Sequence, residues 1–223
     1  MTVTVGFGIL AIENEGGAVR NIGIIAIIMV IVVGCGLFKG EKEYMPLDVG
    51  NEWFYTMTIH LKTTQNDTVI QDTTYTETYK TEITGEAETT TGVTVFVNIT
   101  TFTTNTDTGY LEKRDDDIYY YEFLSDTSPY LILDYPLDDG KTWTSQELSY
   151  EVIGDEDVEV GAGSFKCKKV KQIYGAGWDM ISYIWYADGV GMVKSTSADT
   201  SETAPNTIMI TEIEQVLDDY TVK

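Results

Sequence analysis

Few side chains in this sequence could activate a serine or cysteine as a nucleophile. His60 is the only histidine, and it lies in an alternating segment on the side that carries Thr and Lys, so we expect a solvent-exposed ring. A serine triad would need a serine beside His60, and no G-x-S-x-G motif is present. A pair of Cys167 and His60 stays open, although Phe165 and Cys167 share one strand face, which favours a small buried thiol. We therefore predict no catalytic residue and expect that the chain is not an enzyme.

Two acidic segments could bind a hard cation. Asp155, Asp157 and Glu159 alternate after Gly154, and residues 115–117 form a second cluster of acids. Calcium prefers such oxygen ligands, but neither segment matches an EF-hand loop, and acidic turns are expected in a chain with 36 acidic residues. One histidine and one free cysteine cannot form a closed zinc site. We predict no metal and no cofactor, with structural calcium as the alternative.

Aromatic side chains are the remaining chemical signal. Rings on a sheet can stack on sugars or line an apolar pocket, whereas ordinary cross-strand packing is the alternative. The residues that we predict to line a ligand site are Trp53, Tyr55, Tyr119, Tyr121, Trp143, Trp178 and Trp185. A glycan hydrolase would instead need two carboxylates that face one cleft, and the sequence selects no such pair among its 36 acids.

The N-terminal segment has the features of an export signal. Residues 22–33 are an uninterrupted apolar run that follows Arg20 and precedes a Gly-Cys-Gly sequence. A positive flank, a short apolar stretch and small residues are typical of a signal, and this stretch is at the lower limit of what crosses a bilayer. An uncleaved membrane helix is the alternative. Residues 1–18 contain two acids and no base, which favours a start of translation near Val19.

The end of the apolar run, Val32-Val33-Gly34-Cys35, resembles the lipobox of bacterial lipoproteins. The resemblance implies that Cys35 carries diacylglycerol and becomes the mature N-terminus. Residues 1–35 would then be a signal with a hydrophobic helix, and residues 36–43 would be a short polar tether. Several acyl chains anchor a protein far more firmly than one. We expect a protein of the cell envelope, outside the cytoplasm, that reaches the membrane through the lipid on Cys35.

Alternating hydrophobicity predicts that residues 44–223 form a single all-β domain. Period-two patterns run over residues 53–62 and 93–99, as in half-buried strands. Further strand candidates are residues 75–83, 118–124, 130–133, 143–153, 164–174, 178–186, 191–196 and 208–216.

Turn signals separate these candidates, among them residues 84–85 and 107–109. Short strands with frequent hairpin turns are typical of antiparallel sheets. We predict a curved antiparallel sheet of about 9–11 strands, folded as a half-barrel or a sandwich. Residues 212–220 are ambiguous, and a short helix is the alternative there.

One pattern occurs twice in the sequence. Residues 46–53 and 136–143 both have the form P-L-D-x-G-x-x-W. Proline presets φ for a turn, glycine accepts the left-handed position that closes it, and the tryptophan then enters the next strand. We predict two similar corners at strand entry, with a duplicated ligand-facing corner as the alternative.

The charge of the chain restricts its partners. A formal net charge of −22 repels phosphate backbones, so we expect no nucleic-acid binding. The same charge disfavours adsorption to anionic lipid headgroups, which leaves the covalent anchor as the route to a membrane.

Three segments extend the resemblance to envelope lipoproteins over much of residues 44–196. They read Y-M-P-L-D-V-G-N-E-W, G-S-F-K-C-K-K-V and W-Y-A-D-G-V-G-M-V-K. Some such proteins resemble the outer-membrane lipoprotein carriers, whose curved antiparallel sheet can hold a hydrophobic ligand. The resemblance implies a lipid-anchored protein with a non-enzymatic binding or carrier role for an apolar ligand, a glycan or an envelope protein. A structural or adhesion module is the first alternative, and a glycan hydrolase is the second.

Overall fold

The structure is a computed structural model that describes residues 42–175 and 180–223. The predicted signal, Cys35 and most of the tether lie outside the described residues, as does Trp178. Residues Gly40–Lys223 form one compact unit. Within the two described ranges, no helix is long and apolar enough to span a membrane.

The described residues form an all-β fold, as the sequence predicts. The strands are β1 (Glu52–Gln65), β2 (Thr68–Glu88), β3 (Thr94–Thr101), β4 (Thr106–Arg114), β5 (Asp117–Tyr121), β6 (Tyr130–Leu133), β7 (Thr142–Ser145), β8 (Leu148–Val160), β9 (Gly163–Tyr174), β10 (Ile181–Ala187), β11 (Gly191–Ala204) and β12 (Thr207–Thr221). They form one 12-stranded sheet in the order β6-β5-β4-β3-β2-β1-β12-β11-β10-β9-β8-β7.

The strand count exceeds the expected range for two reasons. Residues 107–109, predicted as a turn, lie within β4. The candidate 143–153 is a hairpin of β7 and β8, because Gln146 adopts a positive φ of 52° and reverses the chain. Residues 212–220 belong to β12 and form no helix.

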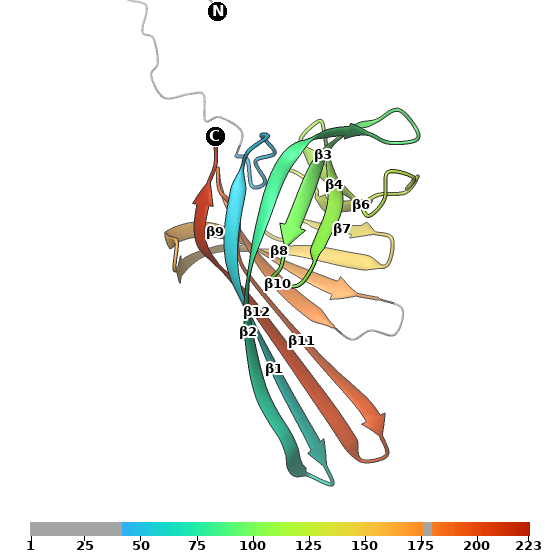
Figure 1. Cartoon of the computed structure of the whole chain (residues 1–223), viewed down its shortest axis with the longest axis vertical. Coiled ribbons are helices and arrows are strands. Elements are labelled where there is room, and N and C mark those ends of the chain that lie inside the picture. Colours follow the sequence, from blue (N-terminus) through green and yellow to red (C-terminus); the bar gives the residue numbers. More distant parts are fainter. Residues whose placement is uncertain (1–41, 176–179) are drawn as a thin grey trace, which may run out of the picture. The chain divides into compact units, whose positions relative to one another are not determined.

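The single sheet curls until its two end strands approach each other (Figure 1). Two hydrogen bonds join β6 and β7, and each connects the backbone of Leu131 to a side chain of β7. The Leu131 amide donates to Ser145 Oγ at 2.6 Å, and Trp143 Nε1 donates to the Leu131 carbonyl at 3.2 Å. The sheet is therefore a nearly closed barrel and not a sandwich.

Four long strands, β1, β2, β11 and β12, continue past the barrel as an extension with two hairpin ends (Figure 1). Side chains near these ends are open to solvent, and Val69, Ile70 and Ile208 are 49%, 58% and 42% exposed. The barrel end of the same strands carries the buried core.

The predicted alternation of residues 53–62 appears in the burial of β1 only at its start, and residues 56–64 are all half-buried. Trp53 and Tyr55 are buried while Phe54 between them is exposed. Val152, Val170 and Leu217 are fully buried, so β8, β9 and β12 supply the same core. Burying side chains of this size stabilises a fold by roughly 1.5–3 kcal/mol each.

The two P-L-D-x-G-x-x-W segments fold into matching corners. In the first, the Asn51 amide donates to the Asp48 carbonyl at 3.0 Å, and in the second the Lys141 amide donates to the Asp138 carbonyl at 3.0 Å. Gly50 and Gly140 have φ values of 89° and 80°, as the turn requires.

Each corner is fixed to the neighbouring strand by the same pair of backbone bonds. Gly50 N donates to the Ile83 carbonyl at 2.7 Å, and Ile83 N donates to the Asn51 carbonyl at 3.0 Å. In the second corner Val152 takes the place of Ile83, with distances of 2.8 and 2.9 Å. The predicted pair of strand-entry corners is therefore present, and the two corners are built alike.

Candidate ligand cavity

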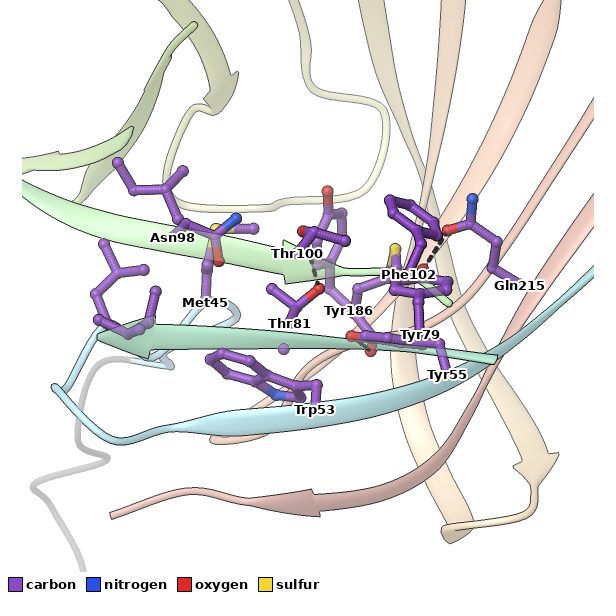
Figure 2. A pocket seen from close by; sticks show the side chains of 15 residues that line it. Met45, Trp53, Tyr55, Tyr79, Thr81, Asn98, Thr100, Phe102, Tyr186 and Gln215 are labelled. Atoms are coloured by element: carbon purple, nitrogen blue, oxygen red, sulfur yellow. Dashed lines mark hydrogen bonds between the residues drawn. The ribbon is translucent and has the colours of Figure 1, made fainter. Parts of the chain in front are cut away.

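A cavity of about 330 Å³ lies inside the barrel beside the first corner. Its lining comes from the segment before β1, from β1–β4, from β10 and the start of β11, and from β12 (Figure 2). The lining residues are Met45, Leu47, Trp53, Tyr55, Tyr79, Thr81, Ile83, Asn98, Thr100, Phe102, Leu111, Tyr186, Gly191, Met192 and Gln215. None of these described side chains is charged.

Strand register brings these side chains to one face of the sheet. Residues directly opposite each other on antiparallel strands point to the same side. Trp53 pairs with Thr81, which pairs with Thr100. Ile83 pairs with Asn98 in the next row. Tyr55 pairs with Tyr79 in a further row, so the part of the wall from β1–β3 is built of cross-strand rows.

Hydrogen bonds hold the aromatic side chains of the wall in place. Trp53 Nε1 donates to the Val190 carbonyl at 2.6 Å, and the Tyr55 hydroxyl donates to the Met192 carbonyl at 2.8 Å. These bonds reach from β1 to the hairpin of β10 and β11. A rigid wall of this kind loses little side-chain entropy when a ligand binds.

Three neighbouring rings form one side of the cavity. Tyr79 lies between Tyr55 and Phe102, with ring centroids 5.1 Å from each. The Tyr79 hydroxyl donates to Gln215 Oε1 at 2.8 Å (Figure 2). Burial raises the pKa of Tyr55 and of Tyr79 well above the ordinary value, so both phenols are uncharged at neutral pH.

Two of the predicted ligand-lining aromatics, Trp53 and Tyr55, lie in this wall, and Trp178 is outside the described residues. The structure places Tyr119, Tyr121 and Trp143 away from the lining. Arg114 lies over the Tyr119 ring at 4.3 Å. The Trp143 ring of β7 stacks on the Tyr150 ring of β8.

Trp185 also lies outside the cavity lining and contacts two lysines. Lys169 and Lys194 lie over its ring at 4.7 and 5.6 Å. The two ammonium groups also bind Glu156 at 3.0 Å and Glu214 at 2.6 Å, so this aromatic side chain is covered by ion pairs. Trp185 is itself buried, and a cation over the face of an indole is attracted to it.

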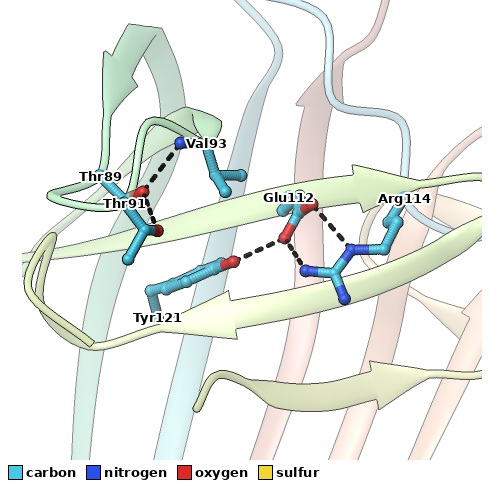
Figure 3. Close-up of polar contacts among 6 residues, drawn as sticks. All are labelled: Thr89, Thr91, Val93, Glu112, Arg114 and Tyr121. Carbon is cyan, nitrogen blue, oxygen red and sulfur yellow. Dashed lines mark hydrogen bonds and ion pairs between the residues drawn. The ribbon is translucent and has the colours of Figure 1, made fainter. Parts of the chain in front are cut away.

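Tyr121 takes part in a polar cluster beside the hairpin of β2 and β3 (Figure 3). Its hydroxyl donates to Glu112 Oε2 at 2.6 Å, and the Arg114 guanidinium binds the same carboxylate at 3.0 and 2.7 Å. Thr89 Oγ accepts from the Val93 amide at 3.0 Å in the adjoining turn. This cluster satisfies a buried acid, so its role is structural.

The histidine and the free cysteine are in separate settings. His60 is 34% exposed, as expected, and its ring nitrogens contact Asp72 at 2.8 Å and Glu212 at 2.9 Å. Cys167 is fully buried, and burial raises the pKa of its thiol to about 11. Both nitrogens of His60 are thus engaged by carboxylates, and the thiol is protonated at neutral pH.

In the acidic segment after Gly154, Asp155 binds lysine, whereas Asp117 in the other segment accepts from the Tyr135 amide at 2.8 Å. Asp155 contacts Lys168 at 2.9 Å, and Lys168 also binds Asp139. In the part of the chain that the structure describes, no group of three or more His, Cys, Asp and Glu side chains is placed to hold a metal ion.

Several lining residues were missed by sequence reasoning. Tyr79 lies in a Thr-rich run whose alternation is weak, and Tyr186 and Met192 lie on strands that approach only in the folded sheet. Asn98 follows the period-two pattern of residues 93–99, which could have placed it on one face, but polar residues in strands are more often solvent-facing.

Part of the chain is similar to a known protein family. Residues 144–206 match the model of the DUF3108-like family. Among curated proteins, no significant match is found.

Two crystal structures are similar to the chain. One is a candidate exported protein with a YmcC-like fold from Bacteroides fragilis NCTC 9343, with 16% identity and a TM-score of 0.47. The other is a candidate lipoprotein from Parabacteroides distasonis ATCC 8503, with 12% identity and a TM-score of 0.46. Each likeness covers 81% of this chain and 99% of the other.

Proposed function

We propose that this chain is an exported, lipid-anchored protein of the cell envelope whose barrel binds an apolar small molecule without transforming it. The sequence Val32-Val33-Gly34-Cys35 supports the anchor, because it follows a short apolar run with a basic flank.

The observation that carries the binding role is the cavity beside the first corner. Its volume of about 330 Å³ lies within the range of small-molecule sites. In a chain with 36 acidic and 14 basic residues, an interior wall without any charged side chain favours an apolar guest. Burying such a guest removes apolar surface from water on both sides.

The same wall supports binding over catalysis. General acid–base chemistry needs a group that titrates near the working pH, and nucleophilic chemistry needs an activated thiol, hydroxyl or amine. The described lining contains tyrosines whose pKa is raised by burial, two threonines and two amides, and none of its groups is a carboxylate, an imidazole or a thiol.

The anchor is tested by metabolic labelling with a fatty acid analogue in a bacterial host. We expect lipid on the wild-type protein and its recovery in the membrane fraction, and no lipid on a Cys35→Ser variant. A wild-type protein that keeps its leader, carries no lipid and stays with the cytosolic fraction would contradict the anchor.

The cavity is tested with N-phenyl-1-naphthylamine, an uncharged probe whose fluorescence rises in apolar surroundings. We expect Thr100→Phe, which adds a ring to the cavity wall, to weaken probe binding at least tenfold. Thr108→Phe is the matched control, because Thr108 is exposed on β4. Equal binding by wild type and both variants would show that the probe does not occupy the cavity.

A further inference from the structure

The two matching corners differ at one position beside the tryptophan. On the strand next to each corner, the residue opposite the tryptophan is Thr81 for Trp53 and Tyr150 for Trp143. The Tyr150 ring stacks on the Trp143 ring, with centroids 4.8 Å apart and planes at 6°. At the first corner a threonine takes the place of this ring, and there the cavity lies.

The indole of Trp53 is only 6% exposed, and it is held by the hairpin of β10 and β11. Its Nε1 donates to the Val190 carbonyl at 2.6 Å, and the backbone of Gly191 comes so close that a Cβ there would lie 3.3 Å from Nε1. In the described residues no aromatic ring stacks on Trp53, and Figure 2 shows its side chain in the cavity wall below Thr81. The ring is thus fixed in position and has no stacking partner among the described residues.

We propose that the ligand presents an uncharged flat ring that stacks on Trp53, at the place that Tyr150 takes against Trp143. This inference rests on the proposed function and names the class of ligand. Offset stacking of two rings adds stabilisation beyond the area that the rings bury.

Polar groups in the same wall specify what the ring carries. Thr81 Oγ and Thr100 Oγ lie 3.2 Å apart, and Figure 2 shows no hydrogen bond from Asn98 to the other residues drawn. The Asn98 amide can therefore donate to or accept from a ligand group. Because the wall contains no charged side chain, a carboxylate would lose its hydration without a counter-ion, so the group is a hydroxyl, a carbonyl or an amide.

The test uses three probes that differ in one property each. They are 2-naphthol, an uncharged ring with a hydroxyl; 2-naphthoate, the same ring with a carboxylate; and 1-decanol, an open chain with a hydroxyl. Each competes with N-phenyl-1-naphthylamine for the wild-type domain at neutral pH. We expect 2-naphthol to bind at least tenfold more tightly than either of the other two.

The outcomes separate this inference from the proposed function. Equal affinity for 1-decanol would overturn the stacked ring, and equal affinity for 2-naphthoate would overturn the uncharged group, while in both cases the cavity still binds. If the naphthylamine probe and all three competitors fail to bind the wild-type domain, the proposed function itself fails.

A substitution that copies the second corner tests the position of the ring. Thr81→Tyr gives Trp53 the partner that Trp143 already has, and we expect it to abolish binding of 2-naphthol. Thr81→Val, which keeps the volume, is the control and should bind within threefold of wild type. Undiminished binding by a folded Thr81→Tyr protein would overturn the inference.

A second measurement covers the case in which Thr81→Tyr does not fold. In the wild-type complex with 2-naphthol we expect intermolecular nuclear Overhauser effects between naphthol protons and the ring protons of Trp53. Their absence in a saturated complex would overturn the stacking on Trp53.

Discussion

Arg114 neutralises Glu112 through two parallel hydrogen bonds, at 3.0 and 2.7 Å, although the two side chains are 50% and 10% exposed. Burial by itself raises the pKa of Glu112, but the hydrogen bonds from Arg114 and Tyr121 outweigh it and hold the pKa below the ordinary value. The buried carboxylate therefore depends on a partner that is half in solvent.

We predict that Arg114→Met lowers the free energy of unfolding by about 1–3 kcal/mol at pH 7, because Glu112 loses both hydrogen bonds from Arg114 and keeps only the one from Tyr121. A carboxylate with a depressed pKa stabilises the fold above its unfolded pKa of about 4.3, and the contribution is lost as pH falls through the folded value. The gap between wild type and variant should thus shrink at acid pH. Urea unfolding of both proteins at pH 7 and at acid pH measures this difference in the free energy of unfolding. A difference that grows on acidification would contradict the stabilising role of the Glu112 carboxylate.

His60 should titrate above the ordinary histidine range. Hydrogen bonds to Glu212 and Asp72 raise its pKa. A raised folded pKa means that the stabilising contribution is complete below about 6.5, the unfolded value, and is lost as pH rises through the folded value. Since His60 is the only histidine, its ring resonances in a carbon-detected NMR titration give the pKa directly.

Single substitutions separate the two carboxylates. Glu212→Gln and Asp72→Asn should each lower the measured pKa of His60, and the double variant should bring it to the value of an unpaired histidine. Glu214→Gln is the control, because Glu214 binds Lys194. A wild-type pKa below about 6.5 would contradict both contacts.

Both corner glycines, Gly50 and Gly140, adopt the left-handed backbone conformation that most residues avoid. Gly140 has a φ of 80°, and a Cβ there would meet no atom within 4 Å, so the cost of Gly140→Ala is conformational. We expect a loss of about 1 kcal/mol. Gly140→Asn should cost less, because Asn tolerates the left-handed region.

Gly85 is the matched control for Gly140. It also leaves open space for a Cβ, but its φ lies outside the left-handed range. Gly85→Ala should be neutral or stabilising by about 0.5 kcal/mol. Thermal or urea unfolding of the variants decides this, and equal losses at both glycines would show that corner geometry is not the cause.

Local patterns predicted much of this fold and little of the cavity. The alternation of residues 53–62 identified β1, and its first two apolar positions, Trp53 and Tyr55, are wall residues. β4 was missed because Gly109 reads as a turn. In the structure it is a strand residue over which the Tyr120 ring lies, and a Cβ at Gly109 would come within 3 Å of that ring.

The rest of the site depends on register between distant segments. Trp53 lies beside Gly191, 138 positions later in the sequence, and no local pattern encodes that contact. The contrast between Thr81 and Tyr150 likewise becomes visible only when strand pairing shows that both lie opposite a corner tryptophan.

The seam between β6 and β7 gives the last prediction. The backbone N–H and C=O of Leu131 bind two side chains of β7, Ser145 and Trp143, in place of a strand ladder. Ser145→Ala removes the acceptor of the Leu131 amide and should cost about 1 kcal/mol. The seam should also open locally more often than the rest of the barrel.

Hydrogen exchange measured by NMR tests the seam residue by residue. In Ser145→Ala the Leu131 amide should exchange at least fivefold faster than in wild type, while amides of β1 and β12, which pair along their length, change only by the global loss of stability. Thr144→Ala is the control, because Thr144 is exposed on the same strand. If both variants speed Leu131 exchange equally, the hydrogen bond to Ser145 does not hold the seam, and the barrel would instead be closed by packing of Trp143 against β6.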